Sequence, residues 1–161
     1  MNNLKLLIGA GFGSGLLPKA PGTWGSLFVL VPLYPIISYS PVFGVLIFAL
    51  TSSLLTLYVS PACVKAWGED PGKLVMDEWA GMSITFVSVT LTHTFWADFT
   101  VLGIGFVFFR FFDILKPLGI HQLQSLKGGF GILLDDILAG FYAFISLKVL
   151  IFLVPKLFGL A

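Results

Sequence analysis

Residues 42–62, VFGVLIFALTSSLLTLYVSPA, form a run of 21 residues without a charged side chain. A helix that crosses the hydrocarbon core of a bilayer needs about 20 residues, so this run has the length of a membrane helix. Two other apolar stretches, 95–112 and 137–154, have a similar length. Together these segments predict that the chain is an integral membrane protein.

Two shorter apolar stretches, 24–38 and 79–92, lie between the long ones. Pro32 and Pro35 should kink the first of them or limit it to partial insertion. The second would need its flanking residues to complete a span. We therefore expect an all-α fold: a polytopic membrane helical bundle with about four to five membrane helices, the first one short or re-entrant.

The composition agrees with this expectation. Of the 161 residues, 57% are hydrophobic and only 11% are charged, whereas a soluble domain has about 25% charged residues. The length suggests one membrane-embedded domain over residues 1–161. A net charge of +1 offers no basic surface for nucleic acid, so the expected partner is membrane lipid. The sequence leaves the oligomeric state open.

The basic residues indicate an orientation. If the N-terminus is inside, the loops on the opposite side, around 39–40 and 93–98, contain no lysine or arginine. The positive-inside rule therefore places the N-terminus in the cytoplasm. The residues that this topology makes cytoplasmic are Lys5, Lys19, Lys65, Lys73, Arg110, Lys116 and Lys127.

The acidic residues are distributed just as unevenly. Seven of the eight fall at or just inside the same cytoplasmic face, and only Asp98 lies opposite. Carboxylates at a membrane boundary are costly unless they are paired or bound to metal, so they are candidates for function. The seven are Glu69, Asp70, Asp77, Glu78, Asp113, Asp135 and Asp136.

A glycine-rich segment, residues 9–26 (GAGFGSGLLPKAPGTWGS), comes first among the candidate motifs. Glycines let backbone N–H groups approach an anion, and we expect Thr23 to cap the following helix. A helix N-terminus favours phosphate. Close packing of membrane helices against small residues explains the glycines equally well.

Two acidic pairs stand at the start of apolar stretches. One is Asp77-Glu78 within residues 70–81 (DPGKLVMDEWAG), and the other is Asp135-Asp136 within residues 128–140 (GGFGILLDDILAG). Helix capping would require only one acid at each place. Adjacent carboxylates repel each other unless a cation lies beside them, and Mg²⁺ suits oxygen ligands without thiol or histidine. Two such pairs on one side favour a shared metal site.

Between these pairs lies RFFDILKP, residues 110–117. Arg110, Asp113 and, more loosely, Lys116 recur at a spacing of three and so share a helix face. An Arg–Asp pair at the membrane boundary has a purely structural explanation. Beside metal-binding carboxylates, however, Arg110 and Lys116 would bind phosphate oxygens.

In their order and spacing, these four segments resemble the phosphatidylglycerophosphatase A family. The resemblance runs from residue 11 to residue 140 and rests on the ordered set of motifs. It implies a Mg²⁺-dependent enzyme of the bacterial inner membrane, with its active face in the cytoplasm. Such an enzyme hydrolyses phosphatidylglycerophosphate to phosphatidylglycerol and inorganic phosphate.

Site roles follow as hypotheses. One or two Mg²⁺ ions would be held by Asp77, Glu78, Asp135 and Asp136, with Asp113 and Asp70 as further candidates. Phosphate oxygens would be bound by Arg110, Lys116, Lys19 and Thr23. One carboxylate would act as general base or as nucleophile, and the lack of an Asp-x-Asp pattern favours attack by metal-activated water.

Two alternatives remain. Another Mg²⁺-dependent lipid phosphate enzyme, such as a phosphotransferase that uses a CDP-linked lipid, would also cluster carboxylates, but its spaced Asp-x-x-x-Asp helix pattern is missing. A membrane ion or proton carrier would also embed acidic residues. A carrier should place them near the middle of the bilayer, whereas these lie towards one edge.

Overall fold

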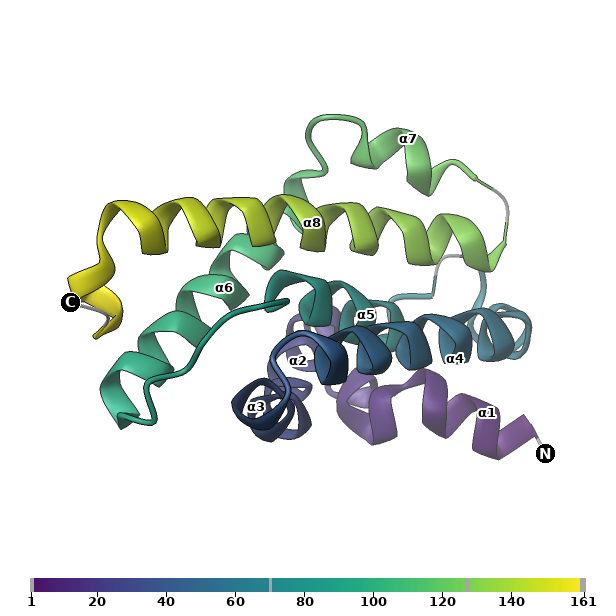
Figure 1. Ribbon diagram of the computed structural model, residues 1–161. Coiled ribbons are helices and arrows are strands. Elements are labelled where there is room, and N and C mark those ends of the chain that lie inside the picture. Colours follow the sequence, from purple (N-terminus) through teal and green to yellow (C-terminus); the bar gives the residue numbers. More distant parts are fainter. Residues whose placement is uncertain (1, 70, 127, 160–161) are drawn as a thin grey trace.

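The computed structural model describes residues 2–69, 71–126 and 128–159, and within these ranges all regular structure is helical (Figure 1). The α-helices are α1 (Asn2–Gly9), α2 (Pro21–Phe28), α3 (Leu30–Tyr39), α4 (Phe43–Trp67), α5 (Met76–Thr85), α6 (Phe95–Leu115), α7 (Ile120–Gln124) and α8 (Gly129–Leu153). Two short 3₁₀ helices, Gly11–Leu16 and Pro155–Phe158, complete the set. The predicted all-α class is confirmed.

Three segments of the described chain are long and apolar enough to cross a membrane: Pro21–Tyr39, Phe43–Trp67 and Gly129–Leu153. The first has 19 residues and is longer than predicted, because the helix begins at Pro21. Its one interruption, at Val29 between α2 and α3, lies three residues before Pro32. This is the expected consequence of a proline, which crowds the preceding turn and lacks an N–H.

The third predicted segment, residues 79–92, is not a membrane-spanning helix. Helix α5 has only 10 residues, which gives a length of about 15 Å against a hydrocarbon core of about 30 Å. Every residue of α5 is buried except Ile84, which is partly exposed. Figure 1 shows α5 between α4 and α8, so its surroundings are protein rather than lipid.

Helix α6 has 21 residues but carries Asp98, Arg110 and Asp113, and it is not among the three segments above. It runs antiparallel to the α2–α3 segment. Arg110 contacts Ser26 near the start of that segment, and Asp98 contacts Tyr34 near its end. Its predicted membrane crossing stays a prediction.

The loops gather at two opposite ends of the bundle. At one end, which we call the site end, the backbone N–H of Val75 donates to Gly9 and the loop after α4 meets the start of α8. At the other, the far end, the N–H of Ser88 donates to the Pro41 carbonyl. Lys148 of α8 also donates to the Ser88 carbonyl there. The loop after α4 and the start of α8, both predicted to be cytoplasmic, thus lie at the same end.

Candidate metal centre and phosphate site

The site is built where α5 crosses α8, and two glycines allow that crossing. A Cβ atom added to Gly140 would lie 2.2 Å from the carbonyl oxygen of Gly81, and one added to Gly81 would lie 2.5 Å from the carbonyl oxygen of Asp136. The two backbones therefore touch without intervening side chains. Asp77 and Asp136 each precede one of these glycines by four residues, so both carboxylates lie on the touching faces.

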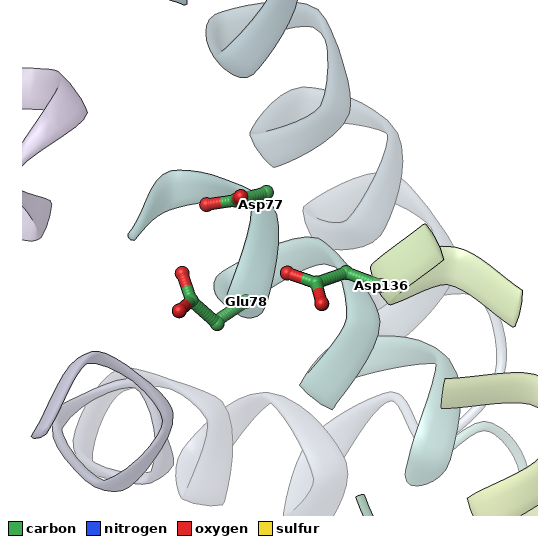
Figure 2. A group of neighbouring side chains, drawn as sticks. All are labelled: Asp77, Glu78 and Asp136. Atoms are coloured by element: carbon green, nitrogen blue, oxygen red, sulfur yellow. The ribbon is translucent and has the colours of Figure 1, made fainter. Parts of the chain in front are cut away.

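Three carboxylates meet beside this crossing. Asp77 and Glu78 from α5 and Asp136 from α8 each offer an oxygen atom within 4.8 Å of the others (Figure 2). Their exposed fractions are only 7%, 9% and 3%. Asp77 Oδ1 and Glu78 Oε2 are buried and have no hydrogen-bond partner among the described residues. Buried acceptors normally have a partner, so these two oxygens are available to a cation.

The electrostatics of this trio agree with that reading. Burial, followed by the charge of Glu78, raises the pKa of Asp77 well above its usual range. Burial also raises the pKa of Glu78 to about 7, although the charge of Arg110 offsets part of the effect. A bound cation would reverse this, because a nearby opposite charge favours the ionised form.

The trio fits a hard divalent cation. All three residues offer carboxylate oxygens, and Mg²⁺ binds such oxygens at about 2.0–2.1 Å, which places opposite ligands about 4 Å apart. The oxygens of the trio lie near that spacing.

Asp135 does not join the trio. Adjacent residues on a helix point about 100° apart, and in α8 it is Asp136 that faces Asp77 and Glu78. Asp135 instead pairs with Lys116, at 2.6 Å between Oδ2 and Nζ. Burial alone would lower the pKa of Lys116, but the hydrogen bond and charge of Asp135 raise it overall. Lys116 therefore stays a cation beside the trio.

Arg110 forms a second cation–carboxylate group. Its Nη1 lies 2.6 Å from Asp113 Oδ2 and 4.0 Å from Glu78 Oε1. The same nitrogen donates to Ser26 Oγ at 3.3 Å, and Nε is buried with no hydrogen-bond partner in the described part of the chain. Arg110 and Asp113 thus share a helix face as predicted, and Arg110 on this face approaches Glu78 of the trio.

The glycine-rich segment reaches the site at Gly22. A Cβ there would lie 2.2 Å from Glu78 Oε1 and 3.3 Å from Arg110 Nη1, so a larger residue would displace the Glu78 carboxylate. The prediction that Thr23 caps the helix is wrong. Helix α2 starts at Pro21 with Ala20 as N-cap, and Thr23 is already the third helical residue, its N–H bonded to the Ala20 carbonyl. Lys19 is exposed beside this N-terminus.

The remaining predicted site residue, Asp70, lies outside the described residues. Ser26 and Gly22 were not predicted as site residues. Their spacing of four, which puts both on one face of a helix, was the available signal; Ser26 also donates to the Gly22 carbonyl at 2.8 Å. A cavity of about 630 Å³ opens at the site end, but it is lined by residues such as Val64, Glu69 and Ile132 rather than by the trio.

A short buried helix presents carboxylates between two membrane-length helices, with an arginine and a lysine beside them, and this defines the class: a helical membrane protein with a candidate cation site. The family model described as phosphatidylglycerophosphatase A matches residues 7–151. The chain belongs to this phosphatidylglycerophosphatase A family, as its motifs predicted.

Curated relatives agree with that membership. The chain is 39% identical to "Phosphatidylglycerophosphatase A" of Haemophilus influenzae, over 86% of this chain and 83% of the relative. It is 34% identical to the protein of the same description in Escherichia coli, over 87% and 79%. A third relative, from Bacteroides thetaiotaomicron, is described as "Putative phosphatidylinositol-3-phosphatase" and is 37% identical over 91% and 92%. No solved structure matches the chain significantly.

Proposed function

We propose that the chain hydrolyses phosphatidylglycerophosphate to phosphatidylglycerol and inorganic phosphate in a Mg²⁺-dependent reaction at the cytoplasmic edge of a bacterial inner membrane. The observation that carries the proposal is the buried trio Asp77, Glu78 and Asp136, in which two oxygen atoms have no hydrogen-bond partner within residues 2–69, 71–126 and 128–159. Two cationic side chains stand beside it. The relatives described as phosphatidylglycerophosphatase A support the choice of lipid.

The five acidic residues divide into two roles. Asp77, Glu78 and Asp136 would hold the cation, which would neutralise phosphate charge and activate a water molecule. Asp113 and Asp135 would instead hold Arg110 and Lys116 in place, as their 2.6 Å contacts suggest. The two cations would bind the non-bridging oxygens of the phosphomonoester. Burial of the trio would exclude bulk water and strengthen these interactions.

The route of phosphate release is open to a direct test. Direct attack by water is a single displacement and should invert the configuration at phosphorus in a substrate whose phosphate is made chiral with oxygen isotopes. Retention of configuration would indicate two displacements and so a covalent aspartyl-phosphate route.

The cytoplasmic orientation can be tested at the exposed Ser125 in the loop before α8. The one native thiol, Cys63, is buried, so a Ser125→Cys variant would carry a single accessible thiol. An impermeant maleimide should label it in inverted vesicles and not in intact cells. Labelling in intact cells would contradict the orientation.

The lipid and the metal are tested together by phosphate release in detergent micelles. We expect release from phosphatidylglycerophosphate with Mg²⁺ and none with a chelator. Phosphatidylinositol 3-phosphate is the second substrate to compare, because the Bacteroides relative carries that description. Faster release from that lipid would replace the proposed substrate, and release that persists with chelator would refute the metal dependence.

A further inference from the structure

The loop that carries Lys116 is held in an unfavourable backbone conformation. After α6 ends at Leu115, Lys116 (φ 46°), Leu118 (φ 54°) and Gly119 (φ 94°) all have positive φ values. A positive φ costs little for glycine but is unfavourable for lysine and for leucine. Such conformations persist only where surrounding contacts hold them.

Helix α8 supplies two of those contacts. Asp135 binds the Lys116 side chain at 2.6 Å, and the hydroxyl of Tyr142 donates to the Leu118 carbonyl at 2.9 Å. Asp135 and Tyr142 are seven residues, or about two turns, apart and so lie on one stripe of the helix. The Tyr142 ring also contacts the ring of Phe112, with 5.6 Å between centroids. The loop is thus fixed to α8 on both sides of Pro117.

We propose that Tyr142 is a positioning residue for substrate binding. Its hydroxyl holds the Leu118 carbonyl and so keeps Lys116 in the left-handed conformation that directs its ammonium group to Asp135 and the phosphate site. This inference rests on the proposed function, in which Lys116 binds a phosphate oxygen. Tyr142 itself lies one turn and more beyond the trio and would not touch the reacting atoms.

The test is a Tyr142→Phe variant, which removes the hydroxyl and leaves the ring contact with Phe112. Loss of one neutral hydrogen bond should raise the KM for the lipid about two- to tenfold while kcat changes little. Acetylation of Lys116 by acetic anhydride, followed by mass spectrometry, should become faster because the ion pair opens more often. Tyr39→Phe is the matched control, since Tyr39 is 90% exposed at the far end.

A double variant separates positioning from general loosening. In a Lys116→Met background, Tyr142→Phe should leave KM unchanged, because the group that it positions is gone. The same rise in KM in that background, or unchanged Lys116 reactivity in Tyr142→Phe, would overturn the inference. A change in reactivity without any change in KM would overturn its role in binding. Failure of the wild type to release phosphate would refute the proposed function, while the Lys116 reactivity could still be read.

Discussion

Replacing Gly140 by alanine adds one methyl group at the point where α8 touches α5. That Cβ would lie 2.2 Å from the Gly81 carbonyl oxygen, whereas ordinary contacts begin at 3.4 Å. The shortfall is 1.2 Å (3.4 minus 2.2), and the obstacle is backbone that cannot rotate away. The two helices must therefore move apart by about an ångström, which separates Asp136 from Asp77 and Glu78.

The magnitudes follow from that displacement. Overpacking costs about 1–3 kcal/mol, and the better helix propensity of alanine returns up to about 1 kcal/mol. The net loss of up to about 3 kcal/mol should lower Tm by several degrees. Misplacing reactive groups by about 1 Å can reduce a rate about 100-fold. We therefore expect a large loss of phosphate release with only a modest loss of stability.

The assay compares initial rates of phosphate release over a Mg²⁺ titration with thermal unfolding in the same detergent. Gly103→Ala is the matched control, because that glycine lies within α6 and no described residue outside its own helical turns has an atom within 4 Å of the added Cβ. The control should keep full activity. A Gly140→Ala variant within about twofold of the wild-type rate, at the same Mg²⁺ requirement, would refute the role of the crossing.

Three further predictions concern charge. Because the pKa of Glu78 is raised from 4.5 to about 7, its protonated form stabilises the metal-free fold below about 4.5, and this contribution is lost as the pH rises through 7. Mg²⁺ must displace that proton, so the affinity from Mg²⁺ titrations should rise with pH up to about 7 and then level off. Equal Mg²⁺ affinities about one pH unit below and above 7 would contradict this prediction. Arg110→Lys keeps the charge but loses the planar guanidinium, whose Nη1 reaches both Asp113 and Ser26, so KM should rise about tenfold; an unchanged KM would count against phosphate binding there. Asp98 accepts from Tyr34 Oη and from the Thr92 N–H at the far end, so Asp98→Asn should lower Tm but leave kcat and Mg²⁺ dependence intact, and a lost Mg²⁺ dependence would place Asp98 in the site.

The sequence predicted the membrane class and the acidic pairs because charged residues are rare enough in this chain for each one to stand out. It could not choose between Asp135 and Asp136, since that choice depends on how α8 is rotated against α5. The rotation is set by the contact between Gly81 and Gly140, which are far apart in the chain. In the sequence, each glycine by itself is explained equally well by close packing against any neighbouring helix.

Two local errors have similar causes. Residues 79–92 are apolar enough to suggest a span, but they are apolar because α5 is enclosed by protein, and hydropathy does not distinguish protein from lipid surroundings. Threonine is a residue type that is preferred at the N-cap. In the structure, however, Ala20 is the N-cap of α2, with φ 47°. The start of the helix is set by Pro21, which suits the first helical position.

Metal binding by two asparagine variants tests the central claim most directly. Mn²⁺ is a spectroscopically visible substitute for Mg²⁺, and its affinity can be measured by electron paramagnetic resonance on the purified protein. Asp136→Asn should weaken that affinity by more than about tenfold, whereas Asp135→Asn should change it by less than about threefold and act on KM instead. Equal losses in both variants, or no loss in Asp136→Asn, would contradict the assignment of Asp77, Glu78 and Asp136 as the metal ligands.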